Sequence, residues 1–144
     1  AIYESEAEII VVNAEDAKGD RRLLTQLFQN IISNAIKYRR QDRSLRVIIN
    51  CVEEDDMLKY SVQDNGIGIS QEYFETIFQA FKRLHSRVKY EGTGIGLAIC
   101  KKIVDIHRGK IWVESVEGEG TTFCFTLPKS QAEIPAMYPV VHAA

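Results

Sequence analysis

The sequence predicts an α+β fold, a two-layer α/β sandwich in which helices cover one face of a mixed, mostly antiparallel sheet. Two stretches of adjacent strand-like runs, 44–65 and 110–128, each predict a hairpin. Two stretches with apolar residues three and four positions apart, 21–38 and 95–107, predict helices. Strands therefore come in neighbouring pairs and do not alternate with helices, which excludes a doubly wound parallel sheet.

The first elements follow from local patterns. The run "AEIIVVN" (7–13) predicts a strand, and "AEDAKGD" (14–20) predicts a loop. Gly19 and Asp20 end this loop, where an acidic residue is well placed to begin the long helix 21–38. We therefore expect a strand, a loop and the longest helix in that order.

A hairpin is expected next. The runs "SLRVIINCVEE" (44–54) and "MLKYSVQDN" (57–65) are strand-like, and the acidic turn "EEDD" joins them. After the loop "DNGIGIS", the segment "QEYFETIFQAF" (71–81) predicts a short helix with Ser70 in the capping position. This part of the chain should contribute two central strands and a small helix.

The second half repeats the pattern. A long polar loop (82–94) precedes the helix 95–107, which should end at Arg108-Gly109 with the glycine as C-cap. The hairpin 110–128 should turn at 117–120, and the tail from Lys129 is expected to be irregular.

Composition sets outer limits on function. The 144 residues, 45% hydrophobic with a net charge of −2, fit one globular domain and exclude a broad polyanion-binding face. The three cysteines (Cys51, Cys100 and Cys124) lie in separate apolar runs, which predicts buried free thiols in a reducing compartment. No apolar run approaches the 18 residues or so of a membrane span.

The stretch "YEGTGIGLAIC" (90–100) predicts a phosphate site. Gly92, Gly94 and Gly96 let the backbone approach a ligand closely, and the helix that follows presents free N–H groups and a positive dipole end. The spacing is not the dinucleotide-binding fingerprint, and no Gly-Lys-Ser/Thr of a Walker loop follows.

Three further features each allow two interpretations. Gln26, Asn30, Asn34 and Lys37 form one polar stripe on the long helix, either a solvated face or a holder for a metal ion and a phosphate. The stretch 64–70 is either an ordinary turn or a rigid carboxylate that accepts a hydrogen bond from an exocyclic amine.

The third feature is the basic loop. Lys82, Arg83, Arg87 and Lys89 are either solvated charges or part of a lid that closes on phosphates. The four features occur in order within 75 residues or so, and their conjunction favours the functional interpretation of each.

In this order the blocks resemble the ATP-binding catalytic domain of sensor histidine kinases, in the superfamily shared with gyrase, Hsp90 and MutL. "LFQNIISNAIKY" is similar to the N box, "DNGIGI" to the first glycine box, "IFQAF" to the phenylalanine box and "GTGIGLAI" to the second glycine box. The resemblance covers residues 8–128, and the region 81–115 looks most like kinases attached to phytochrome, GAF and PAS sensors. It implies a Bergerat-type ATP-binding fold, with one catalytic domain over 1–128 and a tail over 129–144.

The resemblance also implies roles for individual residues. Asp64 would accept a hydrogen bond from the adenine amine. Asn34 would bind Mg²⁺ with help from Asn30, and Arg83 would meet the γ-phosphate. The residues implied in nucleotide binding are Asn34, Lys37, Tyr38, Asp64, Gly66, Gly68, Ile69, Phe81, Gly92, Thr93, Gly94, Ile95, Gly96 and Leu97. Lys37 would contact phosphate, Tyr38 the sugar or base, and Phe78 and Phe81 would anchor the lid.

One departure from the superfamily bears on the reaction. ATP-hydrolysing members carry a glutamate where this sequence has Asn30, and an amide cannot take a proton from water at neutral pH. The resemblance therefore implies transfer of the γ-phosphoryl group to a histidine on a separate dimerisation domain, with a response regulator as further partner. His85, His107 and His142 do not match the phosphoacceptor pattern, and His107 suits a helix-terminal or core position.

The resemblance further implies a C-terminal part of a larger cytoplasmic or membrane-anchored kinase, with no nucleic-acid or direct membrane contact. The alternatives are an ATP-hydrolysing switch of the superfamily, a module that only binds partners, and a protein-serine kinase of the anti-sigma type. Asn30 argues against the first, the intact motifs against the second, and the form of the lid against the third.

Overall fold

In the part of the chain that the structure describes, the main sheet has five strands, and two helices cover one of its faces. The structure is a computed structural model that describes residues 7–13, 16–79, 96–129 and 140–142. The strand order is β1-β3-β4-β6-β5; only β1 and β3 pair in parallel, and the other neighbours are antiparallel. The strands are β1 (Glu8–Val12), β3 (Arg46–Glu54), β4 (Met57–Asp64), β5 (Ile111–Val116) and β6 (Gly120–Pro128). The predicted mixed, mostly antiparallel sheet is confirmed.

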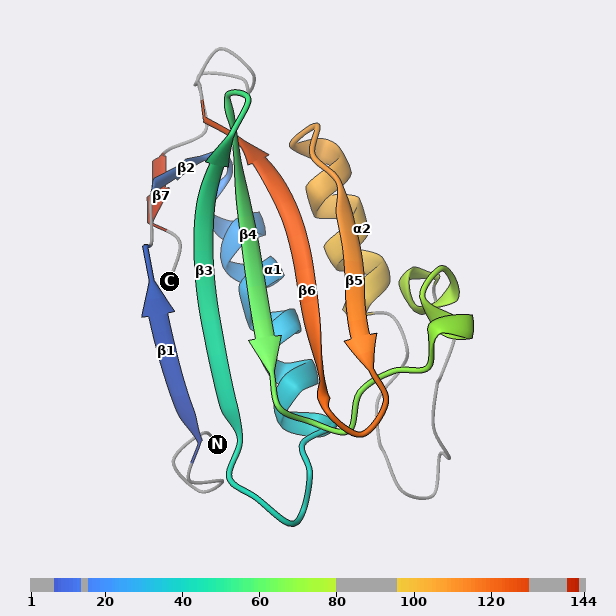
Figure 1. Cartoon of the computed structure of the whole chain (residues 1–144). Helices are drawn as coiled ribbons and strands as arrows, with labels where there is room; N and C mark the ends of the chain where they lie inside the picture. The colour runs from blue at the N-terminus through green and yellow to red at the C-terminus, as the bar shows by residue number, and fades with distance from the viewer. Residues whose placement is uncertain (1–6, 14–15, 80–95, 130–139, 143–144) are drawn as a thin grey trace.

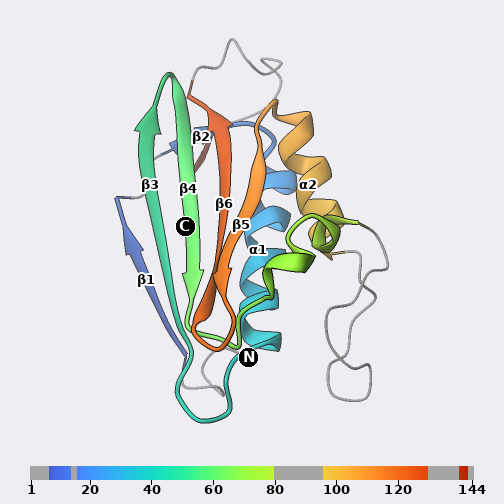
Figure 2. The same cartoon turned by 45° about the vertical axis from the view of Figure 1, so that its right-hand side comes forward.

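Both helices lie on the same side of this sheet, as Figures 1 and 2 show from two directions. They are α1 (Arg21–Lys37) and α2 (Gly96–Ile106), and they agree with the predicted helices to within a residue or two. Apolar side chains of α1, among them Leu24, Leu27 and Ile31, are fully buried against the sheet. The predicted two-layer sandwich is therefore present among the described residues.

Aromatic side chains fill the centre of the core. Phe28 of α1 packs edge-on against Tyr60 of β4 and Phe125 of β6, and those two rings stack on each other at 5.4 Å. Such contacts add to the free energy gained by burying the rings. This cluster joins α1 to the two strands that carry the site described below.

Three predictions of secondary structure are wrong. Asp16–Lys18 forms strand β2 where a loop was expected, and it pairs with β7 (Val140–His142), which lies in a tail expected to be irregular. Pairing between two segments far apart in the sequence leaves no local pattern, although two valines in β7 suit a strand. The expected helix 71–81 is two 3₁₀ turns, η2 (Gln71–Tyr73) and η3 (Thr76–Phe78), in the part described.

Ser70 also behaves differently from the prediction. It occupies the position before η2, but its hydroxyl makes no capping bond to the backbone. Its oxygen instead contacts the Glu72 carboxylate at 3.4 Å. The turns are therefore held by backbone bonds and by the burial of Ile77.

The end of α2 is also built differently from the prediction. The left-handed residue is Arg108, with φ 63°, and Gly109 follows it. The N–H of Gly109 donates to the Val104 carbonyl at 2.9 Å, and the N–H of Arg108 donates to the Asp105 carbonyl at 3.0 Å. Gly109 is required for a different reason, because a Cβ there would lie 1.9 Å from the Thr126 carbonyl oxygen of β6.

The buried thiols agree with the prediction. Cys51, Cys100 and Cys124 are all buried, and they form no disulfide. Burial raises the pKa of Cys100 to about 12 and that of Cys124 to about 11, so both thiols are protonated at neutral pH. Among the described residues, no helix has the length and apolar character needed to cross a membrane.

His107 joins the two helices at the buried end of α2. The ring is fully buried; its Nδ1 lies 2.8 Å from the Ile103 carbonyl oxygen, and its Nε2 accepts the backbone N–H of Asp20 at 3.1 Å. Nδ1 must therefore carry the hydrogen, which makes the ring neutral. Asp20 in turn caps α1 through its side chain, which accepts the N–H groups of Arg22 and Leu23. The core position expected for His107 is confirmed.

We expect His107→Ala to lower the free energy of unfolding by about 2–4 kcal/mol, because it leaves a cavity and removes the acceptor of the Asp20 backbone N–H. Denaturant titration followed by circular dichroism measures the change. Lys102→Ala, at an exposed position of the same helix, should alter stability by no more than about 0.5 kcal/mol. A loss below about 1 kcal/mol for His107→Ala would contradict the role assigned to the ring.

Candidate active site

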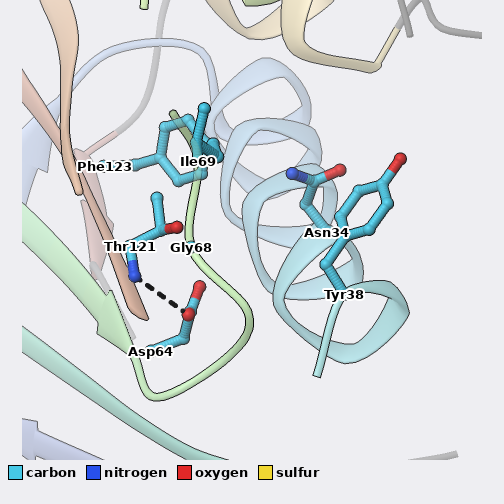
Figure 3. Close-up of a pocket in the computed structure, with 7 residues that line it drawn as sticks. All are labelled: Asn34, Tyr38, Asp64, Gly68, Ile69, Thr121 and Phe123. Atoms are coloured by element: carbon cyan, nitrogen blue, oxygen red, sulfur yellow. Dashed lines mark hydrogen bonds between the residues drawn. The ribbon is translucent and has the colours of Figure 1, made fainter. Parts of the chain in front are cut away.

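A small cavity opens between the C-terminal half of α1 and the ends of β4 and β6 (Figure 3). It is lined by Asn34, Tyr38, Asp64, Gly68, Ile69, Thr121 and Phe123. These residues come from α1, from the end of β4 and the loop after it, and from the start of β6. Segments up to 89 residues apart in the sequence therefore meet at one place.

Asp64 is held rigidly at the end of β4. Its Oδ1 accepts the backbone N–H of Gly66 at 2.9 Å and that of Thr121 at 3.2 Å. The first bond closes the turn after β4, and the second joins that turn to β6. Figure 3 shows the other carboxylate oxygen on the cavity side, opposite Asn34 and Tyr38 of α1.

Burial and hydrogen bonding have opposite effects on the pKa of the Asp64 carboxyl group. Burial raises the pKa of Asp64 above its ordinary value, and the hydrogen bonds from Gly66 and Thr121 partly offset this rise. The net direction is upward, so the folded protein binds this proton more tightly than the unfolded chain. A donor that reaches the second oxygen would relieve part of the desolvation of the charged form.

Gly68 lets the loop after Asp64 pass close to the β5–β6 turn. Its φ of 78° lies in the left-handed region, and a Cβ there would lie 2.4 Å from the Val116 carbonyl oxygen. The N–H of Gly118 donates to the Ile67 carbonyl at 2.7 Å, and the N–H of Ile67 donates to the Tyr38 carbonyl at 3.1 Å. The loop is thus bonded both to the turn and to the end of α1.

The segment after α1 adds a second set of bonds to the same loop. Arg43 donates through Nε to the Asn65 carbonyl at 3.1 Å and through Nη2 to the Glu119 carbonyl at 3.3 Å. The Asn65 side chain accepts the N–H of Arg46 at 2.9 Å and donates to the Ser44 carbonyl at 3.1 Å. Asn65 therefore holds the loop in place and does not face the cavity as a ligand group.

The polar stripe on α1 runs from this cavity towards the start of α2. Asn34 and Tyr38 line the cavity, whereas Asn30, one turn earlier, donates through Nδ2 to the Gly96 carbonyl at 3.3 Å. The amide oxygen of Asn30 remains as an acceptor beside the N-terminal end of α2. Lys37 is exposed on the last turn of α1 and does not line the cavity. Leu97 packs partly buried against the core.

The structure thus unites only part of the predicted site. It places Asn34, Tyr38, Asp64, Gly68 and Ile69 around one cavity, with Gly66 bonded to Asp64. Asn30 and Gly96 are brought together one turn away. Phe81, Arg83, Gly92, Thr93, Gly94 and Ile95 lie outside the described residues.

Two cavity residues were not predicted. Thr121 and Phe123 occupy alternate positions at the start of β6, so both face the helices. Their place after the turn glycine Gly120 was the only local signal. Phe78, expected to anchor the lid, packs edge-on against Phe123 at 6.3 Å and so supports the cavity wall.

Comparison with known proteins gives a consistent result. The family model described as "Histidine kinase-, DNA gyrase B-, and HSP90-like ATPase" matches residues 19–131. The phytochrome-like protein Cph1 of Synechocystis sp. is 50% identical over 127 residues, which are 88% of this chain and 17% of that protein. The chain therefore spans about a sixth of the length of this curated relative.

Solved structures show the same likeness. The catalytic domain of the histidine kinase ThkA superposes with a TM-score of 0.75 at 29% identity, over 92% of this chain and 85% of that chain. The structure of ThkA in complex with the response regulator protein TrrA superposes with a TM-score of 0.71 at 27% identity, over 91% of this chain and 36% of that chain. The predicted fold and the predicted resemblance are both confirmed.

We expect Asp64→Asn to be more stable than the wild type near pH 7, and the difference to grow as pH rises. A raised pKa means that the stabilisation from the bound proton is present below the ordinary value of 3.8 and is lost as pH rises through the folded value. Asparagine does not ionise, and its oxygen still accepts both backbone N–H groups. Unfolding free energies between pH 3.5 and 7.5 measure the difference; one that stays flat or shrinks with pH would contradict the assignment.

Proposed function

The chain belongs to the histidine kinase-, DNA gyrase B- and HSP90-like ATPase family, and we propose that it transfers the γ-phosphoryl group of ATP to a histidine on a separate helical domain. The observation that carries this proposal is the cavity where the free oxygen of Asp64 faces Asn34 and Tyr38. A partly buried carboxylate that lines a cavity suits the exocyclic amine of adenine, which donates hydrogen bonds.

The direction of the bound nucleotide follows from the stripe on α1. Tyr38, Asn34 and Asn30 are spaced four residues apart, so they lie along one side of the helix over about 12 Å. The base would lie against Asp64 and Tyr38, and the phosphates would extend towards Asn30 and Gly96. At that end α2 begins, and a helix N-terminus favours phosphate through its free N–H groups and dipole. Leu97 would contribute its backbone N–H.

The amide oxygens of Asn30 and Asn34 fit a magnesium ion. Mg²⁺ prefers oxygen ligands and commonly takes one or two from the protein, with phosphate oxygens and water completing its shell. The bond from Asn30 Nδ2 to the Gly96 carbonyl turns the amide oxygen away from that contact and leaves it as a ligand. When bound, the ion would neutralise phosphate charge; the role of Asn30 and Asn34 is to orient it beside α2.

The same residues favour transfer to an outside nucleophile over hydrolysis. Asn30 occupies the position where a base would activate water, and its amide nitrogen is committed to Gly96. The γ-phosphoryl group would therefore be transferred only when another domain presents a histidine. We propose that Arg83 and the glycines at 92 and 94 complete the phosphate end, and that Lys37 contacts phosphate there.

The partners in this proposal are a helical phosphoacceptor domain of the same kinase and a response regulator. ThkA, which this chain resembles in structure, has been solved in complex with the response regulator protein TrrA. The proposed γ-phosphoryl transfer would make the first domain the substrate of this chain, and the regulator would receive the group afterwards.

We expect Asp64→Asn to weaken Mg·ATP binding roughly 10- to 100-fold, because the amide nitrogen would face the adenine amine and one charge-assisted hydrogen bond would be lost. Isothermal titration calorimetry measures the affinity. The matched control is Asp56→Asn, the same chemical change in the exposed β3–β4 turn, where asparagine suits the positive φ. Equal affinities for Asp64→Asn and the control would contradict the assignment of the base end.

We expect phosphate transfer to require a separately supplied phosphoacceptor domain. In the presence of Mg²⁺ and γ-labelled ATP, the label should appear on that domain and be lost in acid, as phosphohistidine is. A chelator should abolish the transfer. Rapid phosphate release by the chain alone, or an acid-stable label, would instead support an ATP-hydrolysing switch or a serine kinase.

A further inference from the structure

The hydroxyl group of Ser115 contacts the loop after β4 and the start of β6, two of the segments that line the cavity. Ser115 is in β5, where it pairs with Thr121 of β6. It is not among the residues that line the cavity between Asn34 and Asp64, but it borders a second, more open hollow together with Asp64 and Thr121. Its Oγ lies 2.8 Å from the backbone nitrogen of Ile69, 2.6 Å from the Gly120 carbonyl oxygen and 3.0 Å from the Thr121 hydroxyl oxygen. The Ser115 oxygen is therefore within hydrogen-bonding distance of three partners.

Counting hydrogens fixes the direction of each bond. The Ile69 nitrogen can only donate, so the Ser115 oxygen accepts there. The Gly120 carbonyl can only accept, so the single hydrogen of Ser115 is used in that bond. In the third contact Ser115 has no hydrogen left, and Thr121 must be the donor.

The direction of the Thr121 hydroxyl determines which hydrogen-bonding groups the cavity offers a ligand beside Asp64. With its hydrogen committed to Ser115, Thr121 presents only lone pairs to the cavity, where Figure 3 shows its oxygen above the Asp64 carboxylate. The free oxygen of Asp64 is also an acceptor. Two acceptors side by side match an amine, which has two hydrogens to donate, and they repel a carbonyl oxygen.

We propose that Ser115 is a positioning residue that makes this protein select a purine with an amine at the six-position over one with a carbonyl there. This inference rests on the proposed function, in which the cavity holds the base of ATP. Ser115 acts indirectly, because it keeps the hydroxyl hydrogen of Thr121 directed away from the ligand. Without Ser115, the Thr121 hydroxyl donates into the cavity, either to the carbonyl of a six-oxo purine or to the Asp64 oxygen that the amine needs.

The test compares the affinities of Mg·ATP and Mg·ITP, whose bases differ in this amine and carbonyl, for four forms of the chain. These are the wild type, Ser115→Ala, Thr121→Val and the double variant. We expect Ser115→Ala to reduce the preference for ATP about three- to tenfold, the range of one hydrogen bond. Between Thr121→Val and the double variant the preference should not change, because valine has no hydroxyl for Ser115 to orient.

The ratio of affinities separates this role from a structural one. If Ser115→Ala weakens both nucleotides by the same factor, or if it changes the preference equally with and without the Thr121 hydroxyl, the proposal is overturned. Ser115→Thr keeps the hydroxyl and should keep the preference. If Ser115→Ala does not remain folded, Ser115→Cys, with its weaker donor and acceptor, takes its place in the same cycle.

The same binding measurements test the proposed function separately from the role of Ser115. A wild-type chain that binds neither nucleotide would overturn the proposed function and this inference together. A wild type that binds ATP, with a preference over ITP that Ser115→Ala leaves intact, would overturn only the role of Ser115.

Discussion

The site depends on one carboxylate oxygen. Asp64 Oδ1 accepts the backbone N–H groups of Gly66 and Thr121, and in doing so it joins the end of β4 to the loop after it and to the start of β6. Because both bonds go to the same oxygen, the other is left for a ligand in a place where burial makes an unpaired charge unfavourable. Stability and binding are thereby set against each other at one side chain, as is common at functional sites.

The two ends of the site are built by different parts of the fold. The sheet and its turns build the end around Asp64, which is proposed to hold the base, through backbone bonds among the loop after β4, the β5–β6 turn and the end of α1. The helices build the opposite end, which is proposed to hold the phosphates and where Asn30 of α1 bonds to Gly96 at the start of α2. His107 fixes the far end of α2 to the cap of α1 through the backbone N–H of Asp20. The buried histidine therefore holds together the two helices that meet at the proposed phosphate end.

Most of the fold was predictable because its signals are local. The periodicities of 21–38 and 95–107 predicted α1 and α2, and the paired strand runs, the first joined by the turn "EEDD", predicted both hairpins. Strands β2 and β7 were missed because their stabilisation comes from each other across the whole chain. Asp64, Asn34 and Tyr38, which line the cavity, were predicted through motif order, whereas Thr121, Phe123 and Ser115 were not predicted. Their roles arise from strand register, which pairs Ser115 with Thr121 and cannot be read from a single segment.

The most direct test of the central claim is a crystal structure of this chain with a non-hydrolysable Mg·ATP analogue. The exocyclic amine of the base should lie about 3 Å from the free oxygen of Asp64, while Oδ1 keeps its bonds to the N–H groups of Gly66 and Thr121. The phosphates should extend along α1 towards Asn30 and Gly96. A base bound elsewhere, or an Asp64 that releases both backbone bonds to meet the ligand, would contradict the account.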